Sequence, residues 1–234
     1  MRARLPLVLF GLLALAGVAS VAAQGGGSDT RPGLAVFAFD NGGSYGADKE
    51  DYDALQRGFA GMLIAELAAN PALRLVERDN VQKLLDEQNL AASGRVDAQT
   101  AAKVGKLVGA RYAIVGDFVE LSGQFNVSAR VVNVETSEIM KVASERNTRD
   151  HLFDIVRALA ADLNKQMNFP ALPKQVSEQR MSREVPTEAL TYYSRALLYQ
   201  DRGQRDKAIE YYNKALTAFP QYTEASEGLK RLQG

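Results

Sequence analysis

The stretch that decides the fold is Gly105-Lys106-Leu107-Val108-Gly109-Ala110-Arg111-Tyr112-Ala113-Ile114-Val115-Gly116, where a helical pattern changes to a strand pattern. Gly109 lies where the helix must end, and glycine adopts the left-handed C-cap conformation without a Cβ penalty. The apolar run that follows is typical of a buried strand. Gly105 indicates a helix in close contact with its neighbour, and Gly116 indicates close packing on the strand.

Beyond Gly116 the sequence predicts a meander of three antiparallel strands and a closing helix. The strands span about 111–121, 124–134 and 138–146, because Ser122-Gly123 and Glu135-Thr136-Ser137 separate them as tight turns. The helix covers about 150–167, where Leu152, Ile155, Val156, Leu159 and Leu163 recur at helical spacing.

Before Gly105 the pattern predicts two strands and three helices. An apolar run from Leu34 indicates the first strand, and a helix from about 49 to 69 separates it from a second strand at 73–77. Asp97 is the expected N-cap of the helix that ends at Gly109. The order is therefore βαβααβββα, an α+β domain with a mixed five-stranded sheet packed with helices, in which the first two strands are parallel.

This ordered pattern resembles the CsgG-like curli production assembly/transport family. The resemblance rests on Leu75-Val76-Glu77-Arg78, on the run from Gly105 to Gly116 and on Ala129-Arg130-Val131-Val132-Asn133-Val134-Glu135-Thr136. It covers about residues 34–165 and extends to the related folds of LpoB-type activators and TolB N-terminal domains. It implies a role at the inner face of the bacterial outer membrane and no reactive site.

The C-terminal region resembles one tetratricopeptide repeat followed by a capping helix at about 223–232. Tyr192, Ala196 and Tyr199 mark its first helix, Gly203 its turn, Ala208, Tyr212 and Ala215 its second helix, and Pro220 its end. One repeat buries too little surface to be stable alone. We therefore expect the hairpin to dock on the first domain, on another copy of the chain or on a partner.

The first residues have the pattern of an export signal. Arg2 and Arg4 precede an apolar stretch from Leu5 to Val18 that ends in Val21-Ala22-Ala23, so residues 1–23 are expected to be a cleaved signal peptide. The predicted organisation is then a flexible leader at 24–33, a CsgG-like domain at 34–168, a linker at 169–186 and the helical domain at 187–234. The expected location is the periplasm.

Composition narrows the function further. The chain has 234 residues, with 28 basic and 28 acidic side chains and a formal net charge of zero, which disfavours nucleic acid as a partner. It has no cysteine, so we expect no thiolate chemistry and no lipoprotein anchor. We also expect no membrane span once the signal is removed.

One loop resembles a phosphate-binding element. Gly42-Gly43-Ser44-Tyr45-Gly46 follows the first strand and precedes a helix, as in dinucleotide-binding proteins. Asn41 stands at the first glycine position, and acidic residues occupy the helix start where a phosphate needs positive potential: Asp48, Glu50, Asp51 and Asp53. A nucleotide-binding enzyme that uses this loop is therefore the alternative from another class, while a surface loop is favoured.

No catalytic, cofactor or metal site is predicted. The single histidine, His151, follows Asp150 at a helix start and has no serine or carboxylate pair at a catalytic spacing. The candidate partner-binding residues are Tyr193, Tyr211, Tyr199 and Tyr222 of the helical domain. Tyr193 and Tyr211 fall off its core stripe, and exposed aromatic side chains suit partner contact.

The sequence thus predicts a non-enzymatic periplasmic assembly or adaptor protein associated with the outer membrane. Its partners would be outer-membrane or cell-wall synthesis proteins, with a homo-oligomer also possible. The runner-up, implied by the LpoB-like fold, is an activator of a peptidoglycan synthase. Both functions are binding functions and differ in the partner.

Overall fold

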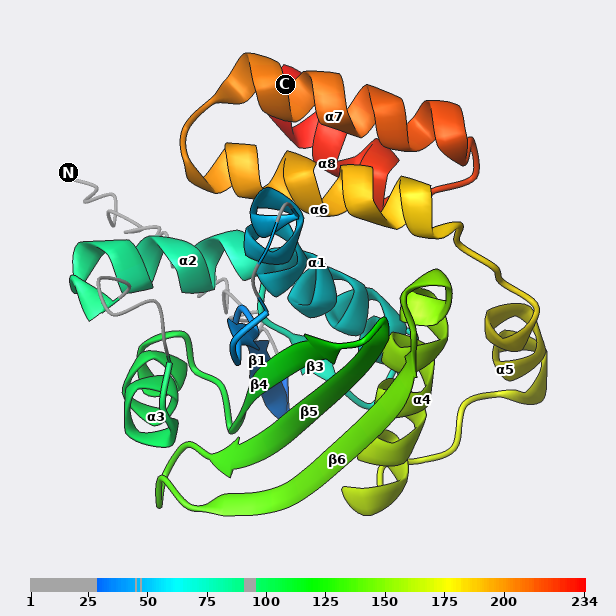
Figure 1. Cartoon of the computed structure of the whole chain (residues 1–234). Helices are drawn as coiled ribbons and strands as arrows, with labels where there is room; N and C mark the ends of the chain where they lie inside the picture. The colour runs from blue at the N-terminus through cyan, green and yellow to red at the C-terminus, as the bar shows by residue number, and fades with distance from the viewer. Residues whose placement is uncertain (1–28, 45, 47, 91–95) are drawn as a thin grey trace, which may run out of the picture. The chain divides into compact units, whose positions relative to one another are not determined.

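The computed structural model describes residues 29–44, 46, 48–90 and 96–234. Residues 31–234 form one compact unit (Figure 1). The predicted signal peptide at 1–23, the leader up to residue 28 and Tyr45 of the glycine-rich loop lie outside the described residues.

The strands are β1 (Gly33–Val36), β2 (Asp40–Asn41), β3 (Arg74–Leu75), β4 (Tyr112–Leu121), β5 (Gln124–Asn133) and β6 (Ile139–Thr148). The helices are α1 (Lys49–Ala68), α2 (Arg78–Glu87), α3 (Ala98–Leu107), the short 3-10 helix η2 (Arg149–His151), α4 (Leu152–Gln166), α5 (Lys174–Met181), α6 (Thr187–Asp201), α7 (Arg205–Ala218) and α8 (Thr223–Gln233). The predicted α+β class and the order βαβααβββα are confirmed.

The sheet is mixed, as predicted, with the order β3-β1-β4-β5-β6. β1 runs parallel to β3 and to β4, while β4, β5 and β6 form the antiparallel meander. The addition to the five predicted strands is β2, which pairs with β4 through Asp40 and Asn41. β4 is longer than β1, so β2 continues the pairing along the part of β4 that β1 does not reach.

The glycines of the deciding stretch have the roles expected of them. Gly109 ends α3 with φ +66°, the left-handed conformation that glycine adopts most easily. A Cβ on Gly105 would lie 2.7 Å from a methyl group of Val134, so glycine allows α3 to approach the sheet. Asp97 caps α3 by accepting a hydrogen bond from the Thr100 amide at 2.7 Å, which holds the pKa of this carboxyl below its ordinary value.

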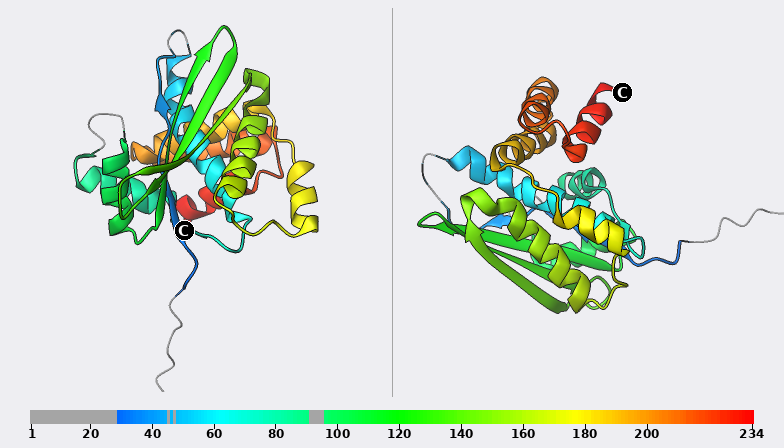
Figure 2. Two further views of the ribbon diagram at one scale, coloured as in Figure 1. Left: turned by 90° about the horizontal axis from the view of Figure 1, so that it is seen from below. Right: turned by 90° about the vertical axis from the view of Figure 1, so that its right-hand side faces the viewer.

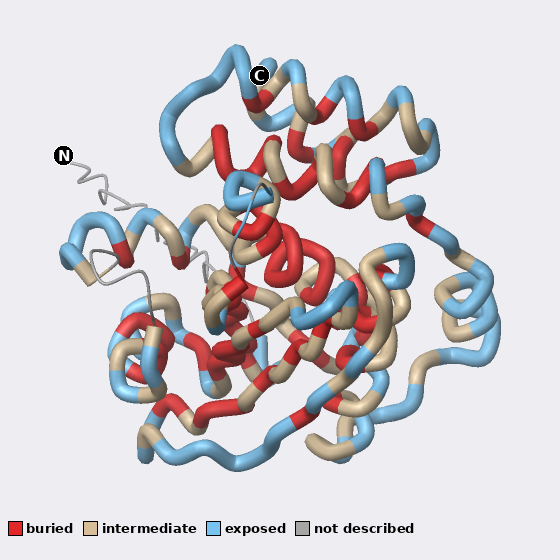
Figure 3. Tube along the Cα trace, viewed as in Figure 1, coloured by how far each residue is buried: buried red, intermediate tan, exposed pale blue. Residues whose placement is uncertain are grey.

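Two hydrophobic cores lie on opposite faces of the sheet. One core joins the sheet to α1 and α4 and contains Phe59, Phe118 and Phe125. The other joins the sheet to α2 and α3 through residues such as Val81, Val104 and Val132. Buried residues alternate with partly buried ones along most of β5 (Figure 3).

The C-terminal helices have the predicted tetratricopeptide-like arrangement. α6 and α7 form an antiparallel hairpin, Gly203 makes its turn with φ +67°, and α8 packs against α7 (Figure 2). The region predicted as a linker at 169–186 contains a helix, α5, between two extended stretches. The hairpin continues the core on the α1 side, because Leu190, Tyr193 and Leu197 join the cluster that includes α1 and α4.

Gly116 offers a test of the packing between the sheet and the α1 layer. A Cβ at this position would collide with the ring of Phe39 and lie 2.6 Å from its Cζ atom. We expect Gly116→Ala to lower the free energy of unfolding by about 1–3 kcal/mol, because the packed ring must move. Urea unfolding measures this change, with Ser144→Ala on exposed β6 as the control. Equal stability of the two variants would contradict the close packing.

Candidate partner-binding site

Helix α6 packs directly on α1, and a glycine makes their close approach possible. A Cβ on Gly58 of α1 would collide with the hydroxyl of Ser194 and lie 2.8 Å from the Ser194 Cβ. Ser194 is fully buried, and its hydroxyl donates a hydrogen bond to the Leu190 carbonyl at 2.8 Å. Small residues at a crossing point let two helix backbones come together. We call this α1–α6 contact the seam.

A buried carboxylate holds one end of the seam. Asp201, at the end of α6, forms ion pairs with Arg57 of α1 at 2.9 Å and with Arg78 of α2 at 2.8 Å. The Asp201 side chain is 7% exposed and that of Arg78 is 12% exposed. Removing one partner from such a buried set leaves an uncompensated charge and destabilises the folded state.

The acidic start of α1 pairs with the outer side of α6. Arg195 binds Asp51 at 2.6 Å, and the Tyr199 hydroxyl donates to Glu50. The bond to Glu50 raises the pKa of Tyr199 to about 12. The carboxylates that crowd the start of α1 therefore contact the hairpin.

Glu66 ties the other end of α1 to α5 and α8. Glu66 is 6% exposed, and it accepts bonds from Arg180 at 2.9 Å and from Arg183 at 3.5 Å. Arg183 also donates to Glu224 of α8 at 2.8 Å. Of the three docking possibilities open to a single repeat, the chain realises the first, with the hairpin packed on its own first domain.

The four predicted tyrosines lie within or beside this packing. Tyr193, Tyr199 and Tyr222 are buried, and Tyr211 is partly buried and stacks on Tyr199 with a centroid distance of 5.2 Å. The expectation that Tyr193 lies off the buried face is wrong, because that face of α6 meets α1 instead of solvent. Partner binding by these tyrosines stays a prediction.

A cleft of about 300 Å³ lies beside the seam, between α1, the start of α2, α6 and α8. Its walls include apolar Ile64, Ala65 and Leu197 together with Tyr193. Charged residues lie around it: Glu77, Arg78, Asp79, Glu224, Glu227 and Arg231. The cleft therefore joins an apolar floor to a charged rim, which is the usual composition of a ligand pocket.

Strand β6 presents a second open surface. Val142 is 52% exposed, Ile139 is 50% exposed and Met140 is 43% exposed. A bulge shifts the register so that Val142 pairs with Arg130 while Ile139 pairs with Val132. Since Arg130 and Val132 point to the same face of β5, the bulge also brings Ile139 and Val142 to one face.

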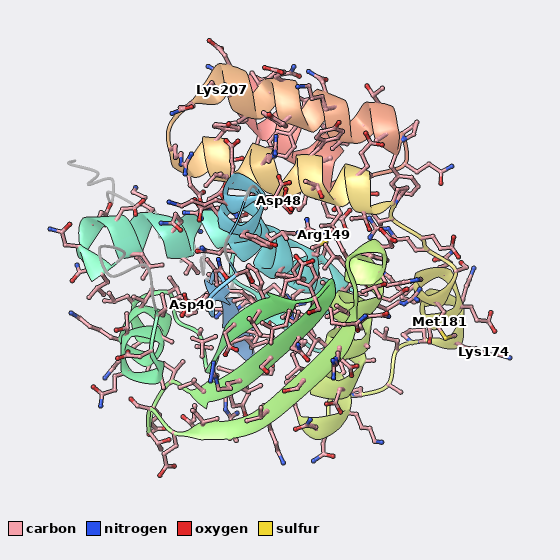
Figure 4. The ribbon with its side chains drawn as sticks, viewed as in Figure 1. Asp40, Asp48, Arg149, Lys174, Met181 and Lys207 are labelled. Atoms are coloured by element: carbon pink, nitrogen blue, oxygen red, sulfur yellow. The ribbon has the colours of Figure 1, made fainter. Side chains whose placement is uncertain are left out.

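The glycine-rich loop is tied to the sheet by its own polar groups. The Asn41 side chain bonds the Ser44 carbonyl and amide, and the buried Ser44 hydroxyl accepts a bond from the Glu120 amide at 2.8 Å. The nearby cation, Arg149, pairs with Glu120 at 2.5 Å and with Asp48 at 3.4 Å (Figure 4). These carboxylates neutralise the positive charge that a phosphate group would need.

The remaining features to consider are the single histidine, a metal site and a membrane-spanning helix. His151 is exposed and bonds Asp154 at 2.9 Å, one turn along the same chain segment. Within residues 29–44, 46, 48–90 and 96–234, no three histidine or acidic side chains are grouped so as to hold a metal ion. No helix in these ranges combines the length and apolarity needed to cross a membrane.

Comparison with known families gives two matches. Residues 17–125 match the model described as curli production assembly/transport component CsgG, and residues 189–222 match the tetratricopeptide repeat. The chain therefore carries a segment similar to CsgG and, C-terminal to it, a segment similar to the tetratricopeptide repeat. Both matched families are assembly or adaptor kinds of protein segment. A comparison with curated proteins gave no match.

Three solved structures show what the fold is similar to. The C-terminal domain of LpoB from Salmonella enterica is 17% identical and covers 50% of this chain and 83% of its own, with TM-score 0.37. The PelC dodecamer from Paraburkholderia phytofirmans is 12% identical, covering 60% and 89%, with TM-score 0.37. TolB from Acinetobacter baumannii is 12% identical, covering 69% and 31%, with TM-score 0.36. At this level of similarity we draw no functional conclusion from them.

Asp201 tests how strongly the seam is held. We expect Asp201→Asn to lower the free energy of unfolding by about 3 kcal/mol, because it leaves Arg57 and the largely buried Arg78 without their shared carboxylate. The control is Glu87→Gln, which removes an exposed ion pair with Lys83 and should change stability by less than about 0.5 kcal/mol. Chemical denaturation compares the two; similar small losses would show that Asp201 contributes little.

The surroundings of the glycine-rich loop predict that the chain does not bind nucleotides. We expect millimolar concentrations of mononucleotides and dinucleotides to leave the melting temperature unchanged, because the carboxylates beside the loop disfavour a phosphate group. A nucleotide that did bind the native state would raise the melting temperature. Thermal-shift measurements on the full chain test this. A rise with one nucleotide that disappears in Ser44→Ala would restore the enzyme alternative.

Proposed function

We propose that this chain is a non-enzymatic assembly or adaptor protein of the bacterial envelope, located in the periplasm at the outer membrane. The CsgG and tetratricopeptide matches support this class of function. The described surface supports it too, because it includes exposed apolar residues on β6 and a cleft with a charged rim. The CsgG-like domain is the platform, and the docked hairpin extends it.

The observation that carries the proposal is the apolar surface on β6. β6 is an outer strand of the sheet, and within the described residues it pairs only with β5. Ile139, Met140 and Val142 lie close together there and are about half exposed, whereas proteins usually place charged residues on the edge strands of a sheet. A protein partner that covers this strand would remove the exposed apolar area from water.

The chain itself limits how a partner can approach. Gln166 of α4 donates to the Val142 carbonyl at 3.0 Å, so the backbone of β6 is partly capped on its outer side. Side-chain contact on the open face is therefore favoured over extension of the sheet by another strand. Arg130, paired with Asp117, lies beside Val142 on that face and adds a polar border.

Photo-crosslinking in the native cells tests the proposal. A photoreactive phenylalanine analogue at Val142 should capture an envelope protein or a second copy of the chain, since Val142 lies at the centre of the proposed contact. The matched control is the same analogue at exposed Lys207 on α7 (Figure 4). Equal capture at both positions, or none at Val142, would contradict the proposal.

The captured protein also distinguishes the finer alternatives. Secretion or outer-membrane components would support a curli-like assembly role, and a peptidoglycan synthase would support the activator role. A second copy of this chain would support self-assembly of the platform. Ile139→Lys combined with Val142→Glu should abolish the captured product while the free energy of unfolding changes little, because both side chains are exposed.

A further inference from the structure

The cleft beside the seam contains a polar group that the chain does not use. Tyr193 lines this cleft, and its side chain is 5% exposed. Its hydroxyl lies against α1, where a Cβ on Gly61 would come within 2.7 Å of it. The rings of Tyr212 and Tyr222 pack against Tyr193, but its hydroxyl makes no hydrogen bond with any described residue. Among the described residues, Tyr222 carries a buried hydroxyl without a hydrogen-bond partner, whereas the Tyr193 hydroxyl is not sealed off in this way and lines the cleft.

Burial also determines the state of this hydroxyl. Removal from water raises the pKa of Tyr193 well above its ordinary value, so the hydroxyl keeps its proton. A protonated phenol can donate one hydrogen bond and accept others. The hydroxyl is therefore suited to a ligand group placed in the cleft.

Some charged side chains of the rim form ion pairs within the chain, and others do not. Arg78 is already paired with Asp201 and Asp79, and Glu224 is paired with Arg183. Glu77, Glu227 and Arg231 make no ion pair with described residues. Two carboxylates and one guanidinium are left, which is an excess of negative charge around an apolar floor.

We propose that the cleft binds a lysine side chain from an extended segment of a partner protein. Ile64, Ala65 and Leu197 form the floor against which the aliphatic stem of the lysine packs. The ammonium group then meets the uncommitted carboxylates of Glu77 and Glu227 and donates to the Tyr193 hydroxyl. An ammonium has three donors and no acceptor, and this set of acceptors matches it.

This site is separate from the β6 surface, and its test does not depend on that surface. Gly61 allows the cleft to reach Tyr193, and α8 supplies the Glu227 rim only while the hairpin is docked on α1. The inference therefore gives the docked hairpin a function: it completes a recognition cleft that neither the sheet domain nor the hairpin forms alone.

Peptide binding to the full-length protein tests the proposal. The probes are amidated, fluorescein-labelled heptapeptides of alanine and leucine that differ only in the central residue, which is lysine, norleucine or glutamate. We expect the lysine peptide to bind about tenfold more tightly than the norleucine peptide by fluorescence polarisation, because it adds charge-assisted hydrogen bonds. The glutamate peptide should bind most weakly.

Conservative variants locate the binding. Glu227→Gln and Tyr193→Phe should each reduce the preference for lysine several-fold, and both keep the size of the side chain. The matched control, Glu210→Gln on the outer side of α7, should leave it unchanged. Equal binding of the lysine and norleucine peptides, stronger binding of the glutamate peptide, or a lysine preference that survives both cleft variants would overturn the proposal.

Discussion

The contact between α1 and α6 is the interaction on which the rest of the structure depends. One side of α1 packs on the sheet and the other side packs against α6 of the hairpin, so both sides contribute buried residues. Gly58 allows the backbones to approach over Ser194, and Asp201 forms its ion pairs with Arg57 and Arg78 only in the docked arrangement. A single repeat that lacks neighbouring repeats obtains its missing core from the sheet domain.

Docking decides which surfaces remain for function. The inner face of α6 contacts α1, so the hairpin does not present an open concave face there. Among the surfaces of the described residues that stay open are the apolar part of β6, the cleft that the hairpin completes with α1 and α2, and the partly exposed Tyr211. The packing of the hairpin on α1 thus gives one combined surface in place of two domains joined only by a linker.

Much of the fold was predictable because its signals are local. Apolar periodicity, the C-cap at Gly109 and the cap at Asp97 depend on neighbouring residues, and they predicted the order of the elements correctly. The seam was not predictable in detail, because Gly58 and Ser194 look like ordinary helix residues until the two helices meet. The bulge in β6 was missed for a related reason: a period of two cannot place Ile139 and Val142 on one face. Tyr193 was chosen for exposure it does not have, although it lines the cleft.

Native-state hydrogen exchange tests the central claim, that the seam makes the sheet domain and the hairpin one cooperative unit. The slowest amides of α6 and α7 should open with the same free energy as the slowest amides of β4 and β5, because undocking would expose Tyr193, Leu197 and the paired charges together. The opening free energies of both regions should also fall in parallel as urea is added. A hairpin that opens at several kcal/mol less than the sheet would contradict the account and show two independently stable parts.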